Sequence, residues 1–151
     1  MRHKRKYAFT FVEIMIVVAI LGILAAIVLP VFQSNVTEAK EAAAKDNLRI
    51  LRSAIELYAA KHNGVGPGCL SDNTNFAHEF IFYLSMLRGY YISAKPKNPF
   101  NNLTTIQMIR GDAPMPKAAT GNYGWIYKPA TKDFRIDWPG TNKTGTKYYD
   151  Y

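Results

Sequence analysis

The chain has 151 residues, of which 48% are hydrophobic, 19 are Lys or Arg and 11 are Asp or Glu. This length holds one ordinary domain and argues against a two-domain enzyme. The single cysteine, Cys69, excludes an intrachain disulfide and a cysteine-rich zinc site. The formal charge of +8 comes partly from four basic residues among the first six, so a basic surface on the folded body is only weakly indicated.

An apolar segment from Phe9 to Val31 is the first predicted element. Only four residues interrupt it: Thr10, Glu13, Gly22 and Pro30. As a helix, these 23 residues would span about 35 Å, which is enough to cross a bilayer core of about 30 Å. Basic residues precede the segment and none follows until Lys40, which predicts a cytoplasmic N-terminus and an extracytoplasmic body. A secretory signal peptide fits less well, because its apolar region is shorter and no convincing cleavage site follows Leu29.

Glu13 is the unusual residue of this segment. A carboxylate at the centre of a membrane helix costs about 2.5 to 3.5 kcal/mol on insertion scales. Glu13 therefore needs a compensating partner, unless it lies at the membrane interface and reaches water.

The residues from Ala8 to Glu13, AFTFVE, precede a long apolar helix and closely resemble the class III signal of type IV pilins and type II secretion pseudopilins. The usual pattern is Gly followed by Phe-Thr-Leu-x-Glu; Ala8 replaces the Gly and Phe11 replaces the Leu. The resemblance implies that a prepilin peptidase cleaves between Ala8 and Phe9 and that the new N-terminus is methylated. Gly22 and Pro30 fall where the family places helix-loosening residues.

Physical reasoning supports the roles that the resemblance implies for these residues. Cleavage before Phe9 leaves an ammonium at the start of a membrane helix, and Glu13 of one subunit would pair with that ammonium on its neighbour. A buried pair is tolerable where a lone buried charge is not. Gly22 lacks a side chain and Pro30 removes a backbone donor, so we expect the helix to open or bend between them during filament packing.

Helical periodicity continues beyond the apolar segment. Apolar residues recur at spacings of 4, 3, 4 and 3, which places them on one helix face: Ala44, Leu48, Leu51, Ile55 and Tyr58. The sequence predicts one helix from about Thr10 to His62, ended by Asn63-Gly64.

The rest of the chain predicts a short helix and a small sheet. The helix should cover about 75–88, and a turn-rich exposed linker should follow at 95–102. Strands are expected at 103–109, 123–128 and 134–138, with a hairpin between the last two. The predicted fold class is α+β: a pilin-like fold with a long N-terminal helix packed against a three-stranded antiparallel sheet. The expected divisions are a leader at 1–8, a transmembrane segment at 9–31 and an extracytoplasmic domain at 32–151, with its sheet at about 103–138.

Two short segments strengthen the resemblance. Asn98-Pro99-Phe100-Asn101, before the sheet, and Gly124-Trp125-Ile126-Tyr127, in its middle strand, are similar to segments of the major, secretion-type pseudopilins.

Enzyme chemistry is not indicated. The sequence contains no P-loop, GxSxG or dinucleotide fingerprint. Cys69 could form a thiol and base pair with His62 or His78, but no motif surrounds it and a buried cysteine is the better interpretation. The sequence therefore predicts no enzyme and no catalytic residue.

Metal and nucleic-acid binding are also disfavoured. Major secretion pseudopilins often hold calcium in a C-terminal loop, but Asp133, Asp137 and Asp150 are the only acidic residues from position 133 onward. Calcium takes six to eight oxygen ligands, so we expect no metal and no cofactor. The C-terminal tail, residues 138–151, alternates Lys with Tyr. This pattern can bind single-stranded DNA. We instead expect a solvated tail whose aromatic residues close the sheet, and no nucleic-acid partner.

The combined prediction is a structural subunit of a pilus-like filament, above all a type II secretion pseudopilin that polymerises through its N-terminal helix to drive protein export. Expected partners are copies of itself or other pilin-like subunits, a prepilin peptidase, an assembly platform and the membrane. The expected location is a bacterial inner membrane, crossed once. A type IV pilus pilin for adhesion, motility or DNA uptake is the nearest alternative; many of these carry a C-terminal cysteine pair, which this chain lacks. A single-pass anchored binding domain is the other.

Overall fold

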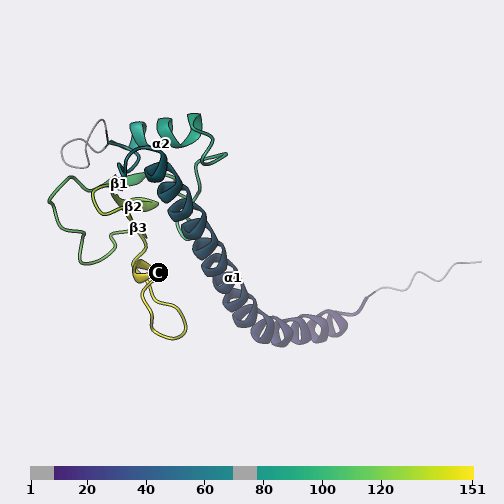
Figure 1. Ribbon diagram of the computed structural model, residues 1–151. Helices are drawn as coiled ribbons and strands as arrows, with labels where there is room; N and C mark the ends of the chain where they lie inside the picture. Colours follow the sequence, from purple (N-terminus) through teal and green to yellow (C-terminus); the bar gives the residue numbers. More distant parts are fainter. Residues whose placement is uncertain (1–8, 70–77) are drawn as a thin grey trace, which may run out of the picture. The chain divides into compact units, whose positions relative to one another are not determined.

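The computed structural model describes residues 9–69 and 78–151 and divides the chain into two compact units, Met1–Glu38 and Ala39–Tyr151. Of the short helix predicted at 75–88, residues 75–77 lie outside the described residues. The elements, drawn in Figure 1, are α1 (Phe11–Lys61), α2 (Glu79–Arg88), β1 (Ile106–Met108), β2 (Trp125–Lys128), β3 (Asp133–Ile136) and a 3₁₀ turn, η1 (Tyr148–Asp150).

Helix α1 runs through both units and includes Pro30. It ends one residue before the predicted His62. The two residues that follow the end, Asn63 and Gly64, have positive φ angles of 52° and 84°. The Gly64 N–H donates to the Ala59 carbonyl at 2.8 Å, so a left-handed cap satisfies one of the last carbonyls of the helix.

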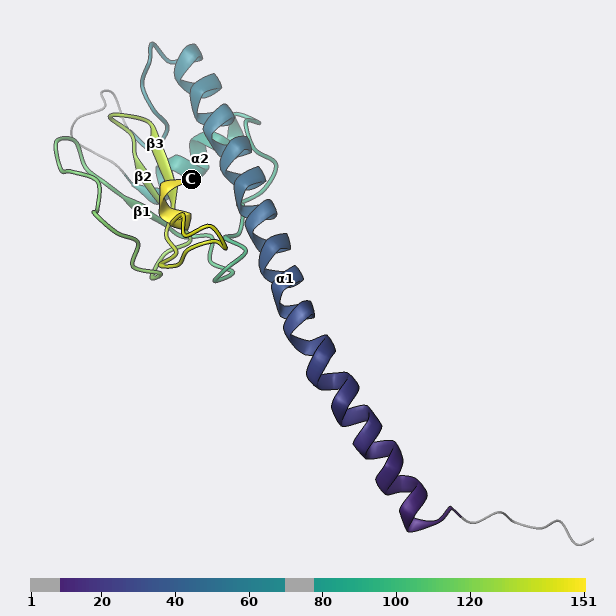
Figure 2. The same ribbon diagram turned by 90° about the horizontal axis from the view of Figure 1, so that it is seen from below.

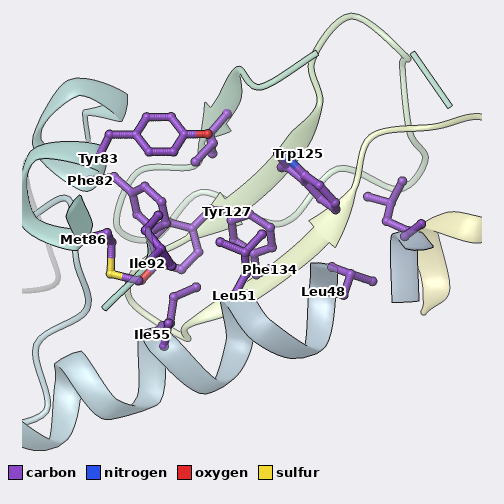
Figure 3. Close-up of a cluster of buried hydrophobic side chains, with 14 residues drawn as sticks. Leu48, Leu51, Ile55, Phe82, Tyr83, Met86, Ile92, Trp125, Tyr127 and Phe134 are labelled. Carbon is purple, nitrogen blue, oxygen red and sulfur yellow. The ribbon is translucent and has the colours of Figure 1, made fainter. Parts of the chain in front are cut away.

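One face of α1 supplies five of the 14 buried residues in the main hydrophobic cluster of the described second unit. Its predicted members Ala44, Leu48, Leu51 and Ile55 are at most 2% exposed, which confirms the face, and Tyr58 packs at its margin. In Figure 3, Leu48, Leu51 and Ile55 point toward side chains from α2 and from the sheet. The labelled partners are Phe82, Tyr83, Met86, Ile92, Trp125, Tyr127 and Phe134.

The sheet has three strands in the order β1-β2-β3, side by side in Figure 2, and it is mixed. β2 and β3 pair antiparallel through the predicted hairpin, with Trp125 opposite Ile136. β1 and β2 pair parallel, with Ile106 opposite Trp125, so the prediction of an all-antiparallel sheet was wrong. The physical reason is the connection 109–124, which is longer than the dozen or so residues that a parallel crossover requires.

Strand β2 is buried on both faces. Trp125 and Tyr127 join the core on the side of α1, while Ile126 faces a second cluster with Ile109 and Tyr149. Met115 and Ala119, both in the 109–124 connection, pack against that second cluster. The long connection and the tail therefore cover the face of the sheet opposite α1.

The segment 95–102, which its turn-rich sequence predicts to be an exposed linker, is exposed at Lys95, Lys97 and Asn102 but buried at its centre. Asn98 is 0% exposed. Its Nδ2 donates to the Gly124 carbonyl at 2.8 Å, and its Oδ1 accepts the Phe100 N–H at 2.9 Å. The indole Nε1 of Trp125 donates to the Pro96 carbonyl at 3.0 Å. The prediction failed at Asn98 because a buried amide in a turn is not distinguishable by composition from a solvated one.

These contacts join the two segments that resemble secretion-type pseudopilins. Gly124 lies so close to the segment before β1 that a Cβ there would overlap the Leu103 carbonyl oxygen. Only glycine allows this approach.

Candidate functional site

The start of α1 is built by a reciprocal pair, Thr10 and Glu13. The N–H and the hydroxyl of Thr10 each donate to Oε2 of Glu13 at 2.8 Å. The Glu13 N–H donates to Oγ1 of Thr10 at 3.2 Å. This is a capping box, and the negative charge lies at the positive end of the helix dipole. The Thr-x-x-Glu spacing was visible in the sequence, but its capping role was overlooked.

The capping box gives the Glu13 carboxylate hydrogen-bond partners within its own chain. Two donors of the same chain already compensate the carboxylate, so a single subunit does not carry an unpartnered charge at this position. Both donors reach Oε2, which leaves Oε1 for another donor.

Within the described residues, the large apolar side chains of the first half of α1 are exposed. Phe9 is 79% exposed, and large apolar side chains remain exposed as far as Phe32. Within the described residues, α1 is the one helix long and apolar enough to cross a membrane, and none of its most apolar window is buried. Monomeric soluble proteins rarely expose an apolar surface of this size. This surface needs lipid or other protein chains around it.

The other predicted residues of this segment lie within α1 or before its start. Gly22 and Pro30 both lie inside the continuous helix, and nothing lies within 4 Å of the position of a Cβ on Gly22. Phe9 lies two residues before the start of the helix, and Thr10 separates the two. Ala8 lies outside the described residues.

The part of the second unit that follows α1, residues 62–151, is called the head. Arg52, which the sequence did not single out, holds the head against α1. Its Nε and Nη2 donate to the Phe134 carbonyl at 3.0 and 2.8 Å, and its Nη1 donates to the Tyr151 carbonyl at 2.7 Å. Burial lowers the pKa of this guanidinium from its ordinary value. Arg52 therefore ties β3 and the tail to the helix through backbone acceptors. No residue type at positions 134 and 151 could have predicted this contact, because any residue supplies a carbonyl.

The structure places the predicted thiol and base residues, Cys69, His62 and His78, in the second unit. Cys69 is buried, as predicted, and the His78 N–H donates to the carbonyl of the neighbouring Gly68 at 3.2 Å. The His62 ring stacks on Tyr58 with centroids 3.9 Å apart, and its Nδ1 lies 2.8 Å from the Tyr58 carbonyl oxygen. In the part of the chain that the structure describes, no group of three or more His, Cys, Asp or Glu residues could hold a metal ion.

The three C-terminal carboxylates are engaged by the protein itself. Asp133 Oδ2 accepts from Nε and Nη2 of Arg135 at 3.0 and 2.8 Å, and Asp150 lies 4.0 Å from the same guanidinium. Asp137 is 0% exposed and faces the loop from Thr120 to Tyr123. Arg135 thus engages two of these carboxylates, and the 120–123 loop engages the third.

The aromatic residues of the tail close the sheet, as predicted. Tyr148 and Tyr149 are each 4% exposed, so their ring faces do not form a stacking platform for nucleic-acid bases. The hydroxyl of Tyr151 donates to Oε1 of Glu41 at 2.7 Å.

A capped, fully exposed apolar helix segment continuous with an α+β head defines a pilin-like subunit that is anchored in a membrane. The comparisons with known proteins agree. The family model of the prokaryotic N-terminal methylation motif matches residues 3–29.

Three relatives extend this match. The type II secretion system core protein G of Aeromonas hydrophila is 31% identical over 107 residues, which cover 68% of this chain and 73% of that protein. The protein of the same name from Pseudomonas aeruginosa is 41% identical over 58 residues, 38% of this chain and 41% of that protein. The type IV major pilin protein PilA of Myxococcus xanthus is 50% identical over 50 residues, 33% of this chain and 23% of that protein. No solved structure matches significantly.

The chain belongs to the pilin-like family of the type II secretion system core protein G. It is a structural, pilus-type subunit, and its relatives are structural proteins rather than enzymes.

Proposed function

We propose that the chain is a type II secretion pseudopilin that polymerises through the first half of α1 and drives protein export by the growth of the filament. The observation that carries this proposal is the apolar surface from Phe9 to Phe32, exposed on every side and capped at its start by Thr10 and Glu13. Several helices of this kind packed side by side would bury a surface that one chain leaves uncovered.

Processing is the first step of the proposed route. A prepilin peptidase cleaves between Ala8 and Phe9, and the new N-terminus is methylated. Cleavage places an ammonium next to Thr10 and four residues from Glu13. Since Thr10 occupies Oε2 of Glu13, the neighbouring subunit's ammonium is received at Oε1. The pairing sets the axial offset between two subunits.

The same proposal fixes topology and partners. The leader 1–8 is cytoplasmic, the segment 9–31 spans a bacterial inner membrane once, and the domain 32–151 lies on the far side. Its partners are other pilin-like subunits, the prepilin peptidase and an inner-membrane assembly platform. Gly22 and Pro30 allow the helix to bend or open as the subunit leaves the bilayer and enters the filament.

A type IV pilus pilin is the second candidate, because half of the residues in a 50-residue match to the Myxococcus pilin are identical. The longer Aeromonas match covers about two thirds of this chain, which favours the secretion subunit. Deletion of the gene in its native host separates them: loss of exported protein supports the pseudopilin, and loss of surface pili with export intact supports the pilin.

Mass spectrometry of the membrane-extracted protein tests the processing step. We expect an N-terminus at Phe9 carrying a methyl group. An intact leader in a host with an active prepilin peptidase would contradict the proposal.

Glu13→Gln tests the assembly step, because it keeps the size of the side chain and removes the charge. Membrane insertion should persist while filament assembly and export fall. Glu38→Gln, in the same helix beyond the apolar segment, is the matched control and should leave assembly unchanged. Normal assembly of the Glu13 variant would assign Glu13 to helix capping alone.

A further inference from the structure

Asp137 is the most completely buried carboxylate of the described chain, and the proposed filament function does not use it. It follows β3 directly, and its N–H donates to the Gly124 carbonyl at 3.2 Å, which extends the pairing of β2 with β3. Its side chain turns to the loop from Thr120 to Tyr123, at the end of the long connection between β1 and β2.

Four donors of this loop converge on the carboxylate. Oδ1 accepts the N–H of Thr120 and, at 3.0 Å, the N–H of Gly121. Oδ2 accepts the Thr120 hydroxyl at 2.9 Å and the Tyr123 N–H at 2.9 Å. Three backbone N–H groups wrapped around one anion form a nest, and Gly121 allows it by adopting a φ of 78°.

This arrangement leaves no place for a cation. An ionised carboxylate has about four lone-pair sites, and four donors occupy those of Asp137. The backbone N–H groups also present their positive ends where a metal ion would have to lie. Asp133 and Asp150 are held by Arg135, and calcium requires six to eight oxygens around one point. The residues present therefore do not fit the calcium ion implied by the resemblance to major secretion pseudopilins.

We infer that this head folds without calcium, and that the carboxylate of Asp137 holds the Thr120–Tyr123 loop closed in place of a bound cation. The anchored loop is the last part of the connection that lets β1 run parallel to β2, so Asp137 also stabilises the mixed sheet. Ala119, next to Thr120, packs on the second core cluster, which links the anchor to the covered face of the sheet. The inference concerns the fold of the head and is independent of the export function.

Thermal melting of the full-length protein in detergent micelles tests the inference. For the unmodified chain we expect the same Tm in excess EDTA and in excess calcium chloride. Asp137→Asn should lower the Tm by about 5–10 °C, equally in both buffers. The reason is that the introduced NH₂ is a donor, so it cannot accept a hydrogen bond from the backbone N–H that it faces. Asp112→Asn, an exposed carboxylate in the same connection, is the matched control and should leave the Tm unchanged.

A smaller change separates anchoring from general damage. Thr120→Val removes one hydroxyl donor and keeps the backbone nest, so its Tm should fall less than that of Asp137→Asn in both buffers. A calcium-dependent rise in the Tm of the unmodified chain would overturn the inference. An Asp137→Asn variant as stable as the control would overturn it as well.

Discussion

The two halves of α1 share one secondary structure and have opposite relations to the rest of the chain. Up to about Phe32 the helix is apolar on every side and exposed on every side. From Ala44 onward it is apolar along one stripe, and that stripe is buried. A helix that is apolar all round requires a surrounding apolar phase, whereas a helix with one apolar stripe requires one packed face.

This contrast separates two sources of stability within one continuous helix. The second half is stabilised by its own head, through the contacts of Leu48, Leu51 and Ile55 with the sheet and α2. In the first half, none of the side chains up to Phe32 is buried against the part of the chain that the structure describes. Changes in the second half should therefore alter folding, and changes in the first half should alter membrane insertion and assembly.

Removal of the first half is the most drastic test of the contrast. A chain that starts near Val36 keeps the buried stripe and loses the whole exposed apolar surface, so we expect a complete shift from the membrane fraction to the soluble fraction. The soluble head should be monomeric, and melting followed by circular dichroism should show that it folds cooperatively. An aggregated or unfolded product would mean that the first half contributes to the fold of the head.

The buried stripe itself gives the largest expected effect of a single substitution. Leu51 is 0% exposed, and Leu51→Asp would place a charge in the helix-to-sheet contact at a cost of about 3–5 kcal/mol, enough to unfold a marginal head. Leu57 lies on the same helix and is 51% exposed, so Leu57→Asp is the matched control and should change the free energy of unfolding by less than about 0.5 kcal/mol. Equal melting curves for the two variants would refute the assignment of the core face.

Asn98 should give an intermediate effect. Asn98→Ala removes a donor to the Gly124 carbonyl and an acceptor of the Phe100 N–H, both in a buried environment. We expect a loss of about 1–3 kcal/mol in urea denaturation. Asn122→Ala, at an exposed position, should lose far less. Similar losses from both would show that the amide of Asn98 is not a structural contact.

The sequence predicted the features of α1 that depend on hydrophobic periodicity or on an uninterrupted apolar run. Spacings of 4 and 3 identified the buried face of α1, and the apolar run identified its exposed half. The pairing of β1 with β2 could have been read from the long connection 109–124, and the capping box from Thr10 and Glu13. Both signals are present in the sequence, but an antiparallel meander is the simpler interpretation of three short strands, and the apolar surroundings of Glu13 favour a partner on a neighbouring subunit.

Other features could not be predicted, because their partners are backbone groups. Arg52 donates to carbonyls of residues 134 and 151, and Asp137 accepts from N–H groups of residues 120, 121 and 123. Every residue except proline carries such groups, so only the fold determines which of them meet. The proposed processing and assembly roles of Ala8, Phe9, Glu13, Gly22 and Pro30 depend on groups of other chains, which the sequence of this chain does not specify.

The smallest expected effect concerns the contact of the tail with α1, and it depends on pH. Hydrogen bonds from Lys45 and Tyr151 lower the pKa of Glu41 below its ordinary value of 4.5. A carboxyl whose pKa is lower in the folded state stabilises the fold above its unfolded pKa, and this contribution is lost as the pH falls through the folded value. Burial, with the Glu41 contact, raises the pKa of Tyr151 to about 12, so the phenol stays protonated throughout this range.

Glu41→Gln and Tyr151→Phe should therefore each lower the free energy of unfolding near neutral pH, by about 0.5–1 kcal/mol, and the difference from the unmodified chain should shrink as the pH falls well below 4.5. The comparison with the unmodified chain at each pH cancels any effect of acid that the variants share with it. Urea denaturation at neutral and acidic pH measures both differences. If the Glu41→Gln difference is the same at both pH values, the carboxylate charge of Glu41 has no part in holding the tail on the helix, and the Tyr151 hydroxyl is an ordinary neutral donor.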